Sequence, residues 1–229
     1  MVITRLTEII ALADLVLLVL MSGLCLGWFN SLKPAFRYLA IYVWGVTLVE
    51  LVAKLYYFGV IVGSNLWLLH VYTSFEFIVL SLLYREILST SAKSKRMFSW
   101  YIGTVAVGIG VYSVLALVAN FPEKPDLFQL HSKIVVHGSV MVYSGMLLLR
   151  ILQSPQQYIS GFRGLLPVNS ALLLYFAGSF AIFLTLRFLV ESDLEQTILL
   201  WLINAVLTLV LHMLCIFGLW ARDSKTAPN

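Results

Sequence analysis

Residues 196–220 read QTILLWLINAVLTLVLHMLCIFGLW, a stretch without aspartate, glutamate, lysine or arginine. About 20 consecutive apolar residues form a helix long enough to cross the hydrocarbon core of a bilayer, which is about 30 Å thick. The stretch therefore predicts a membrane-spanning helix. Six more apolar stretches precede it, and the seven predicted spans are 8–29, 36–59, 66–88, 98–120, 128–152, 167–190 and 196–220.

The composition supports the same fold class. The chain has 229 residues, of which 61% are apolar and 11% charged, with a mean hydropathy of +0.94. A soluble domain is roughly 45–50% apolar and about 25% charged. Seven spans use roughly 140 residues, which leaves too few for a soluble kinase, nucleotide-binding or DNA-binding module. We expect residues 1–229 to form a single all-α domain, a bundle of seven transmembrane helices.

The basic residues predict how the helices are oriented. Cytoplasmic loops retain lysine and arginine, and the two sides of the predicted topology differ strongly. One side carries only Arg5 and Lys124, whereas the other, with loops one, three and five and the C-terminus, carries Lys33, Arg37, Arg85, Lys93, Lys95, Arg96, Arg150, Arg163, Arg222 and Lys225. The N-terminus should face out and the C-terminus in, in a bacterial inner (plasma) membrane. The net charge of +4 then follows from loop placement and indicates no nucleic-acid partner.

Ionisable residues inside the predicted spans are the main functional signal. A charged side chain at the centre of a membrane helix costs roughly 2.5–3.5 kcal/mol on insertion scales, so each should face a partner or water. The candidates, which lie away from the cytoplasmic ends of the spans or deep within them, are Asp14, Glu50, Lys54, His70, Glu76, His131, Lys133, His137, Arg187 and His212. All but His212 fall in the outer half of the predicted topology. This clustering predicts a polar cavity that opens outward.

Two spans carry the acids of greatest interest. Glu50 and Lys54 are spaced i, i+4 with the acid first, the favourable order for an intrahelical ion pair, and self-neutralisation is the simpler interpretation of both. Glu76 lies several turns from either end of the third span and about 120° around the helix from His70. Its side chain is too short to reach water from there. We therefore expect either a cation from a neighbouring helix, such as Lys54 or Lys133, that keeps it ionised, or a carboxyl group that desolvation keeps protonated.

The fifth and seventh spans complete the candidate set. Lys133 and His137 share one helical face, and Asn204 belongs to a polar seam along the last span, where interhelical hydrogen bonding is the simpler explanation. The residues predicted to bind a ligand or ion are therefore Glu50, Lys54, His70, Glu76, Lys133, His137 and Asn204.

Small and sulfur-containing residues have structural interpretations. Thr104 and Gly108 form a small-xxx-small pair in the fourth span that lets a neighbouring helix approach closely. Packing inside the bundle is the preferred interpretation of this face, and a homodimer contact is the alternative. Cys25 and Cys215 belong to no CxxC motif and no Cys/His cluster, and they are predicted to be buried thiols.

Short motifs also carry a family resemblance. The pattern Thr47-Leu48-Val49-Glu50-Leu51, the stretch HVYTSFEF at 70–77 and an Asn204-bearing last span resemble small seven-helix membrane proteins of Bacteroidota-type bacteria. The resemblance covers most of the chain and implies the seven-helix topology. It points to Glu50, Glu76 and Asn204 but implies no activity and no cofactor.

Three function classes fit these observations. The leading interpretation is a receptor-like or sensory protein that binds a small ligand or ion in the outward cavity and signals through a separate cytoplasmic partner. The alternative is a proton- or ion-coupled transporter with Glu50 and Glu76 as protonatable sites. The third is a membrane-embedded lipid-modifying enzyme with a His/Glu metal site, although HExxH is absent and ligands would have to come from separate helices. The last span lacks the lysine that a retinal Schiff base would need there, and the sequence identifies no cofactor.

Overall fold

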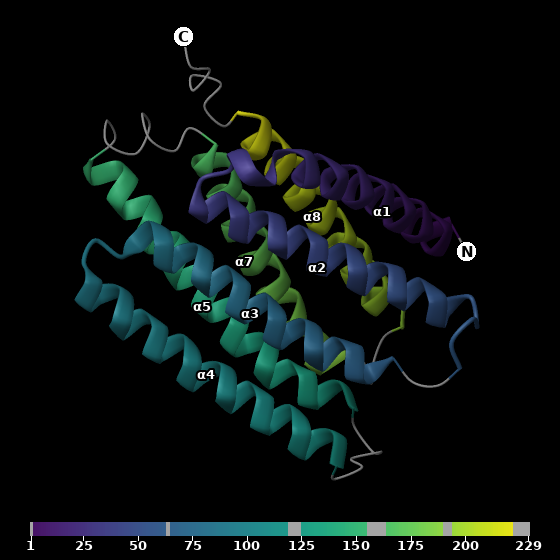
Figure 1. Cartoon of the computed structure of the whole chain (residues 1–229). Coiled ribbons are helices and arrows are strands. Elements are labelled where there is room, and N and C mark those ends of the chain that lie inside the picture. Colours follow the sequence, from purple (N-terminus) through teal and green to yellow (C-terminus); the bar gives the residue numbers. More distant parts are fainter. Residues whose placement is uncertain (1, 63–64, 119–124, 155–163, 190–193, 222–229) are drawn as a thin grey trace. The chain divides into compact units, whose positions relative to one another are not determined.

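The structure, a computed structural model, describes residues 2–62, 65–118, 125–154, 164–189 and 194–221, and seven of its helices are long and apolar enough to cross a membrane. They are α1 (Val2–Trp28), α2 (Pro34–Tyr57), α3 (Leu66–Leu88), α4 (Ala92–Val118), α5 (Pro125–Gln153), α7 (Leu165–Leu189) and α8 (Leu194–Trp220), with a 3₁₀ turn η1 (Phe29–Ser31) after α1 (Figure 1). The described residues contain no strand. The predicted all-α, seven-helix membrane protein is confirmed. Lys124, Arg163, Arg222, Lys225 and the side chain of Arg187 lie outside what the structure describes.

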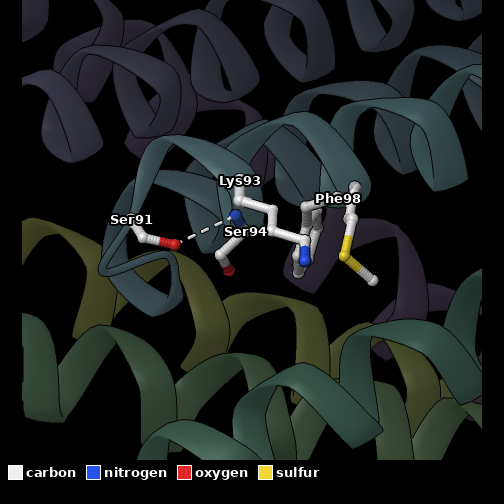
Figure 2. A pocket seen from close by; sticks show the side chains of 5 residues that line it. Ser91, Lys93, Ser94 and Phe98 are labelled. Carbon is white, nitrogen blue, oxygen red and sulfur yellow. Dashed lines mark hydrogen bonds between the residues drawn. The ribbon is translucent and has the colours of Figure 1, made fainter.

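The start of α4 differs from its predicted position by a functionally relevant amount. The basic cluster Lys93, Lys95 and Arg96 was expected in a loop before a span starting at 98, but α4 begins at Ala92 and carries all three. Ser91 caps this helix, since its Oγ accepts a hydrogen bond from the Ser94 backbone N–H at 3.1 Å (Figure 2). Long basic side chains are compatible with a helix end in the headgroup region because they can extend toward water.

The chain forms two compact units, and their boundaries cross α1 and α5. The first, here called the central unit, comprises Leu18–Val136. The second, the terminal unit, comprises Met1–Leu17 and His137–Asn229.

In the central unit, α2 packs against α3 and α3 against α4 (Figure 1). Gly45 of α2 faces the Phe75 ring so closely that a Cβ at this position would overlap it. The part of α1 from Leu18 onward belongs to the central unit and contacts α2 through hydrogen bonds. Ser22 and Thr47 share a hydrogen bond of 2.8 Å, and Trp44 Nε1 donates to the Ser22 carbonyl at 3.1 Å. Close backbone approach and hydrogen bonds are how membrane helices associate when apolar burial gives no net gain in lipid.

In the terminal unit, α7 packs against α8. Gly178 leaves room for the Leu207 side chain, and Gly218 leaves room for Val168. The part of α5 from His137 onward is joined to α7 by two reciprocal hydrogen bonds. Ser144 Oγ donates to Asn169 Oδ1 at 3.0 Å, and Asn169 Nδ2 donates to the Ser144 carbonyl at 3.2 Å. Both side chains are buried, so this pair satisfies polar groups that lipid could not.

The small-residue face of α4 is not packed where it was predicted to be. Thr104 and Gly108 are exposed, and a Cβ added at Gly103 or Gly108 would meet nothing. The preferred interpretation of this face, packing inside the bundle, is therefore wrong. Cys25 and Cys215 are both buried, as expected.

Candidate functional site

The carboxylate of Glu76 is the centre of the candidate site. The side chain is completely buried and belongs to α3, ten residues after Leu66 and twelve before Leu88. At about 1.5 Å per residue, it lies about 15 Å from the nearer helix end, which corresponds to the middle of a bilayer core about 30 Å thick. Water is therefore not a ready hydrogen-bond partner, and the protein must supply the partners.

Two tyrosines occupy one carboxylate oxygen. Tyr72, one helical turn before Glu76 on α3, donates its hydroxyl to Glu76 Oε1 at 2.7 Å. Tyr42 of α2 donates to the same oxygen at 3.3 Å. Because both donors converge on Oε1, the carboxyl group is held in one orientation and Oε2 points away from the phenols.

The second carboxylate oxygen faces a lysine. Lys133 of α5 is also buried, and its Nζ lies 3.8 Å from Glu76 Oε2. That distance is an ion pair but is too long for a direct hydrogen bond. The same ammonium lies 5.2 Å from the centre of the Tyr72 ring, close enough for a favourable cation–π contact. We call Tyr42, Tyr72, Glu76 and Lys133 the Glu76 cluster.

Glu76 Oε2 is chemically the most available atom of this cluster. It is buried, and no described residue donates a hydrogen bond to it. A buried acceptor in this state costs free energy, whereas a donor placed beside it would recover that loss. The cluster can therefore accept a hydrogen bond from an O–H or N–H group of a small molecule at Oε2.

The predicted choice between two cations for Glu76 is settled by geometry. Lys133, and not Lys54, lies beside the carboxylate. Lys54 is half-buried near the end of α2, with its Nζ 5.5 Å from the Tyr57 ring centre, and Glu50 is half-buried one turn before it. His70 is buried on α3, six residues before Glu76, where its backbone carbonyl accepts a hydrogen bond from Ser74.

Two predicted site residues belong to the terminal unit. His137 is completely buried among aromatic rings, with its ring centre 4.9 Å from that of Phe176 and 5.6 Å from that of Phe183. Asn204 is half-buried on α8, and its Oδ1 is enclosed without a hydrogen bond from a described residue. The structure therefore joins Glu76 and Lys133, and it places His137 and Asn204 in the other compact unit.

The terminal unit contains a second ionisable pair that the predicted site omits. His212 Nδ1 of α8 lies 2.7 Å from Asp14 Oδ1 of α1, and both residues are buried. Asp14 was expected in the outer half of its span, but α1 starts at Val2, which places Asp14 near the middle of the helix. Both residues stand out in the sequence as intramembrane ionisable groups, but 198 positions separate them and no motif links them.

Among the described residues, no group of three or more histidine, cysteine, aspartate or glutamate side chains could hold a metal ion. The candidate site is thus a carboxylate–ammonium pair with two phenols. In comparisons with known proteins, no family model, no curated protein and no solved structure matches the chain. The chemistry of the site has to be argued from its own geometry.

Proposed function

We propose that this integral membrane protein is receptor-like and binds a small polar ligand at the Glu76 cluster. The observation that carries the proposal is the state of the carboxylate, which is fully buried at mid-membrane depth. Its Oε1 accepts hydrogen bonds from two tyrosine hydroxyls, whereas its Oε2 accepts none from a described residue and lies 3.8 Å from Lys133 Nζ. Intramembrane ionisable groups are costly and are typically functional.

The charges of the cluster favour a particular ligand class. A carboxylate and an ammonium sum to zero, and a metal cation beside Oε2 would lie close to the Lys133 ammonium. Repulsion between like charges is strong in a medium of low dielectric constant. A neutral or zwitterionic molecule with a hydrogen-bond donor for Oε2 and an acceptor for Lys133 Nζ fits both groups.

Occupation of this cluster would change how three helices are held together, since Tyr42 belongs to α2, Glu76 to α3 and Lys133 to α5. These helices would then have one arrangement with the ligand and another without it. A ligand that inserts between Glu76 Oε2 and Lys133 Nζ favours one arrangement only to the extent that it binds that arrangement more tightly. The signal would pass to a separate protein at the basic side of the membrane, where the described turn between α3 and α4 lies. Placement in a bacterial inner membrane belongs to the same proposal.

The experiment is to identify what co-purifies with the protein. Wild type and Glu76→Gln are purified from the membrane in mild detergent and denatured, and the released small molecules are measured by mass spectrometry. Gln keeps the shape of the side chain and an acceptor for the tyrosines but replaces the acceptor Oε2 with an NH2 donor. Ser81→Ala is the matched control, because Ser81 is fully buried on the same helix and its hydroxyl receives no hydrogen bond from a described residue.

We expect a small polar molecule at near-equal amount to protein in wild type and Ser81→Ala, and its loss in Glu76→Gln. A double variant, Glu76→Gln with Lys133→Met, removes both charges and avoids an unpaired buried ammonium; it should also lose the molecule while remaining folded. Equal recovery from all four proteins, or no recovered molecule from wild type, would contradict the proposal.

A proton-coupled transporter is the second candidate, and the Asp14–His212 pair favours it. Buried carboxylate and histidine groups are typical of proton relays in membrane proteins. Its test is the collapse of an imposed pH gradient across proteoliposomes. The receptor proposal predicts no collapse beyond that of empty vesicles. A collapse that Glu76→Gln and His212→Phe each abolish would replace the receptor with a transporter.

A further inference from the structure

The exposed face of α4 carries a groove with a polar and an apolar end. The groove has a volume of about 620 Å³ and is lined by Arg96, Ser99, Trp100, Gly103, Thr104 and Val107. These positions recur at three- and four-residue steps and therefore lie along one side of the helix. We call it the Arg96 groove. A neighbouring hollow, lined by Lys93 and the Ser91 cap among others, lies at the start of the same helix (Figure 2).

Arg96 is the exposed cation that lines this groove. Two nearby basic residues are occupied: Lys95 Nζ lies 2.8 Å from Glu86 Oε2, and Arg85 lies 2.9 Å from Glu86 Oε1 and 3.0 Å from Ser99 Oγ. Lys93 is also exposed, but it lines the neighbouring hollow. The Arg96 side chain is exposed, and no ion pair joins it to a described residue. Its planar guanidinium is suited to bidentate binding of a phosphate group.

The length of the groove matches one leaflet of a bilayer. Arg96 and Val107 are eleven residues apart, which is about 16 Å along a helix and about half of a 30 Å hydrocarbon core. Trp100, 73% exposed, lies between the cation and the apolar end, and tryptophan is enriched at headgroup level. Beyond it, Gly103 leaves open space above the backbone, where an acyl chain can lie against the helix.

A second copy of the chain is a poorer occupant of this face. All copies insert with the same orientation, so a two-fold axis would run along the membrane normal and place equivalent residues at the same depth. Two Arg96 side chains would then face each other, and like charges repel. We propose that the Arg96 groove binds an anionic phospholipid, with its phosphate at Arg96 and one acyl chain along Gly103, Thr104 and Val107.

The test is native mass spectrometry of the purified full chain titrated with phosphatidylglycerol, with phosphatidylcholine and inorganic phosphate as comparison ligands. A basic residue near a membrane surface contributes enough to anionic lipid binding for about a fivefold change in affinity. Arg96→Gln should therefore weaken phosphatidylglycerol binding about fivefold or more, and Arg96→Lys should weaken it less. Lys93→Gln is the control, because it removes the same charge from an exposed side chain three residues away that lines the other hollow.

Gly103→Leu tests the apolar end without a change of charge. Its side chain would fill the groove, and it should not disturb the fold because nothing lies within contact distance of an added Cβ. We expect weaker phosphatidylglycerol binding, an unchanged melting temperature and no competition from inorganic phosphate.

Equal effects of Arg96→Gln and Lys93→Gln would show nonspecific attraction to a basic surface and overturn the proposal. Competition by inorganic phosphate, or unchanged lipid affinity in Gly103→Leu, would show that no acyl chain occupies the groove. A dimer that Gly103→Leu disrupts and Arg96→Gln strengthens would assign the face to a second copy.

Discussion

The two buried ionisable pairs described above, His212 with Asp14 and Lys133 with Glu76, differ in how closely the two partners approach each other. His212 Nδ1 and Asp14 Oδ1 share a short hydrogen bond of 2.7 Å, whereas Lys133 Nζ and Glu76 Oε2 lie 3.8 Å apart. A pair with ideal geometry offsets much of the cost of removing two charges from water, and a longer one offsets less of it. This contrast suggests a structural role for the first pair and a binding role for the second.

The structural role of the first pair predicts a specific pattern of stability losses. His212→Phe leaves the Asp14 carboxylate buried without its partner and should lower the free energy of unfolding by about 3–5 kcal/mol. The double variant Asp14→Leu with His212→Phe should lose clearly less, because no stranded charge remains. Chemical denaturation in detergent measures both, and equal losses would show that the two side chains do not depend on each other.

The same argument applies to the pair formed by Lys133 and Glu76. Lys133→Met strands the Glu76 carboxylate and should lower the melting temperature more than Lys133→Met combined with Glu76→Gln. If the single variant melts as high as the double variant, Lys133 does not neutralise Glu76 in the membrane. Neither outcome depends on knowing the ligand.

At the scale of elements, the space around a helical glycine shows whether that face of the helix is packed against a neighbour or exposed. A Cβ added at Gly45 of α2 would overlap the Phe75 ring of α3, whereas one added at Gly103 of α4 would meet open space. Both are helical glycines, so the loss of backbone flexibility on substitution is similar for the two. Their difference is steric alone.

The two glycines therefore provide a matched pair of substitutions. Gly45→Leu should destabilise the protein by about 1–3 kcal/mol, the usual cost of overpacking, because the Phe75 ring has to move. Gly103→Leu should leave stability unchanged or slightly raised, since leucine is the better helix former. Melting temperatures of the two variants in one detergent check this, and a similar loss in both would contradict the assignment of their faces.

The helices could be predicted because their signal is local, whereas the site depends on long-range contacts. Apolar runs located all seven spans, and α3 matches its prediction at both ends. α4 was predicted to start late because Lys93 and Arg96 are typical of loops, although the Ser91 cap was a readable start signal. Glu76 stood out by its depth, and Tyr72 is readable as its i, i+4 neighbour. Tyr42, 34 residues away, carries no sequence signal that links it to Glu76.

At the scale of the whole molecule, the remaining sequence prediction is orientation in the membrane. The unequal distribution of lysine and arginine places the turn at Ser91 inside and the turn at Asn65 outside. Both residues are exposed, and the two native cysteines are buried, so background labelling should be low. With a membrane-impermeant maleimide on intact cells, Asn65→Cys should label and Ser91→Cys should label only after lysis. The reverse pattern would invert the topology and the depth of every residue.

The most direct measurement of the central claim is an experimental structure of the protein extracted with its own lipids, at a resolution that shows small molecules. The account predicts non-protein density at the Glu76 cluster, within about 3 Å of both Glu76 Oε2 and Lys133 Nζ, with Tyr42 and Tyr72 still on Oε1. A structure in which Lys133 Nζ donates directly to Oε2, with no density between the two side chains, would contradict the claim that this cluster is a ligand site.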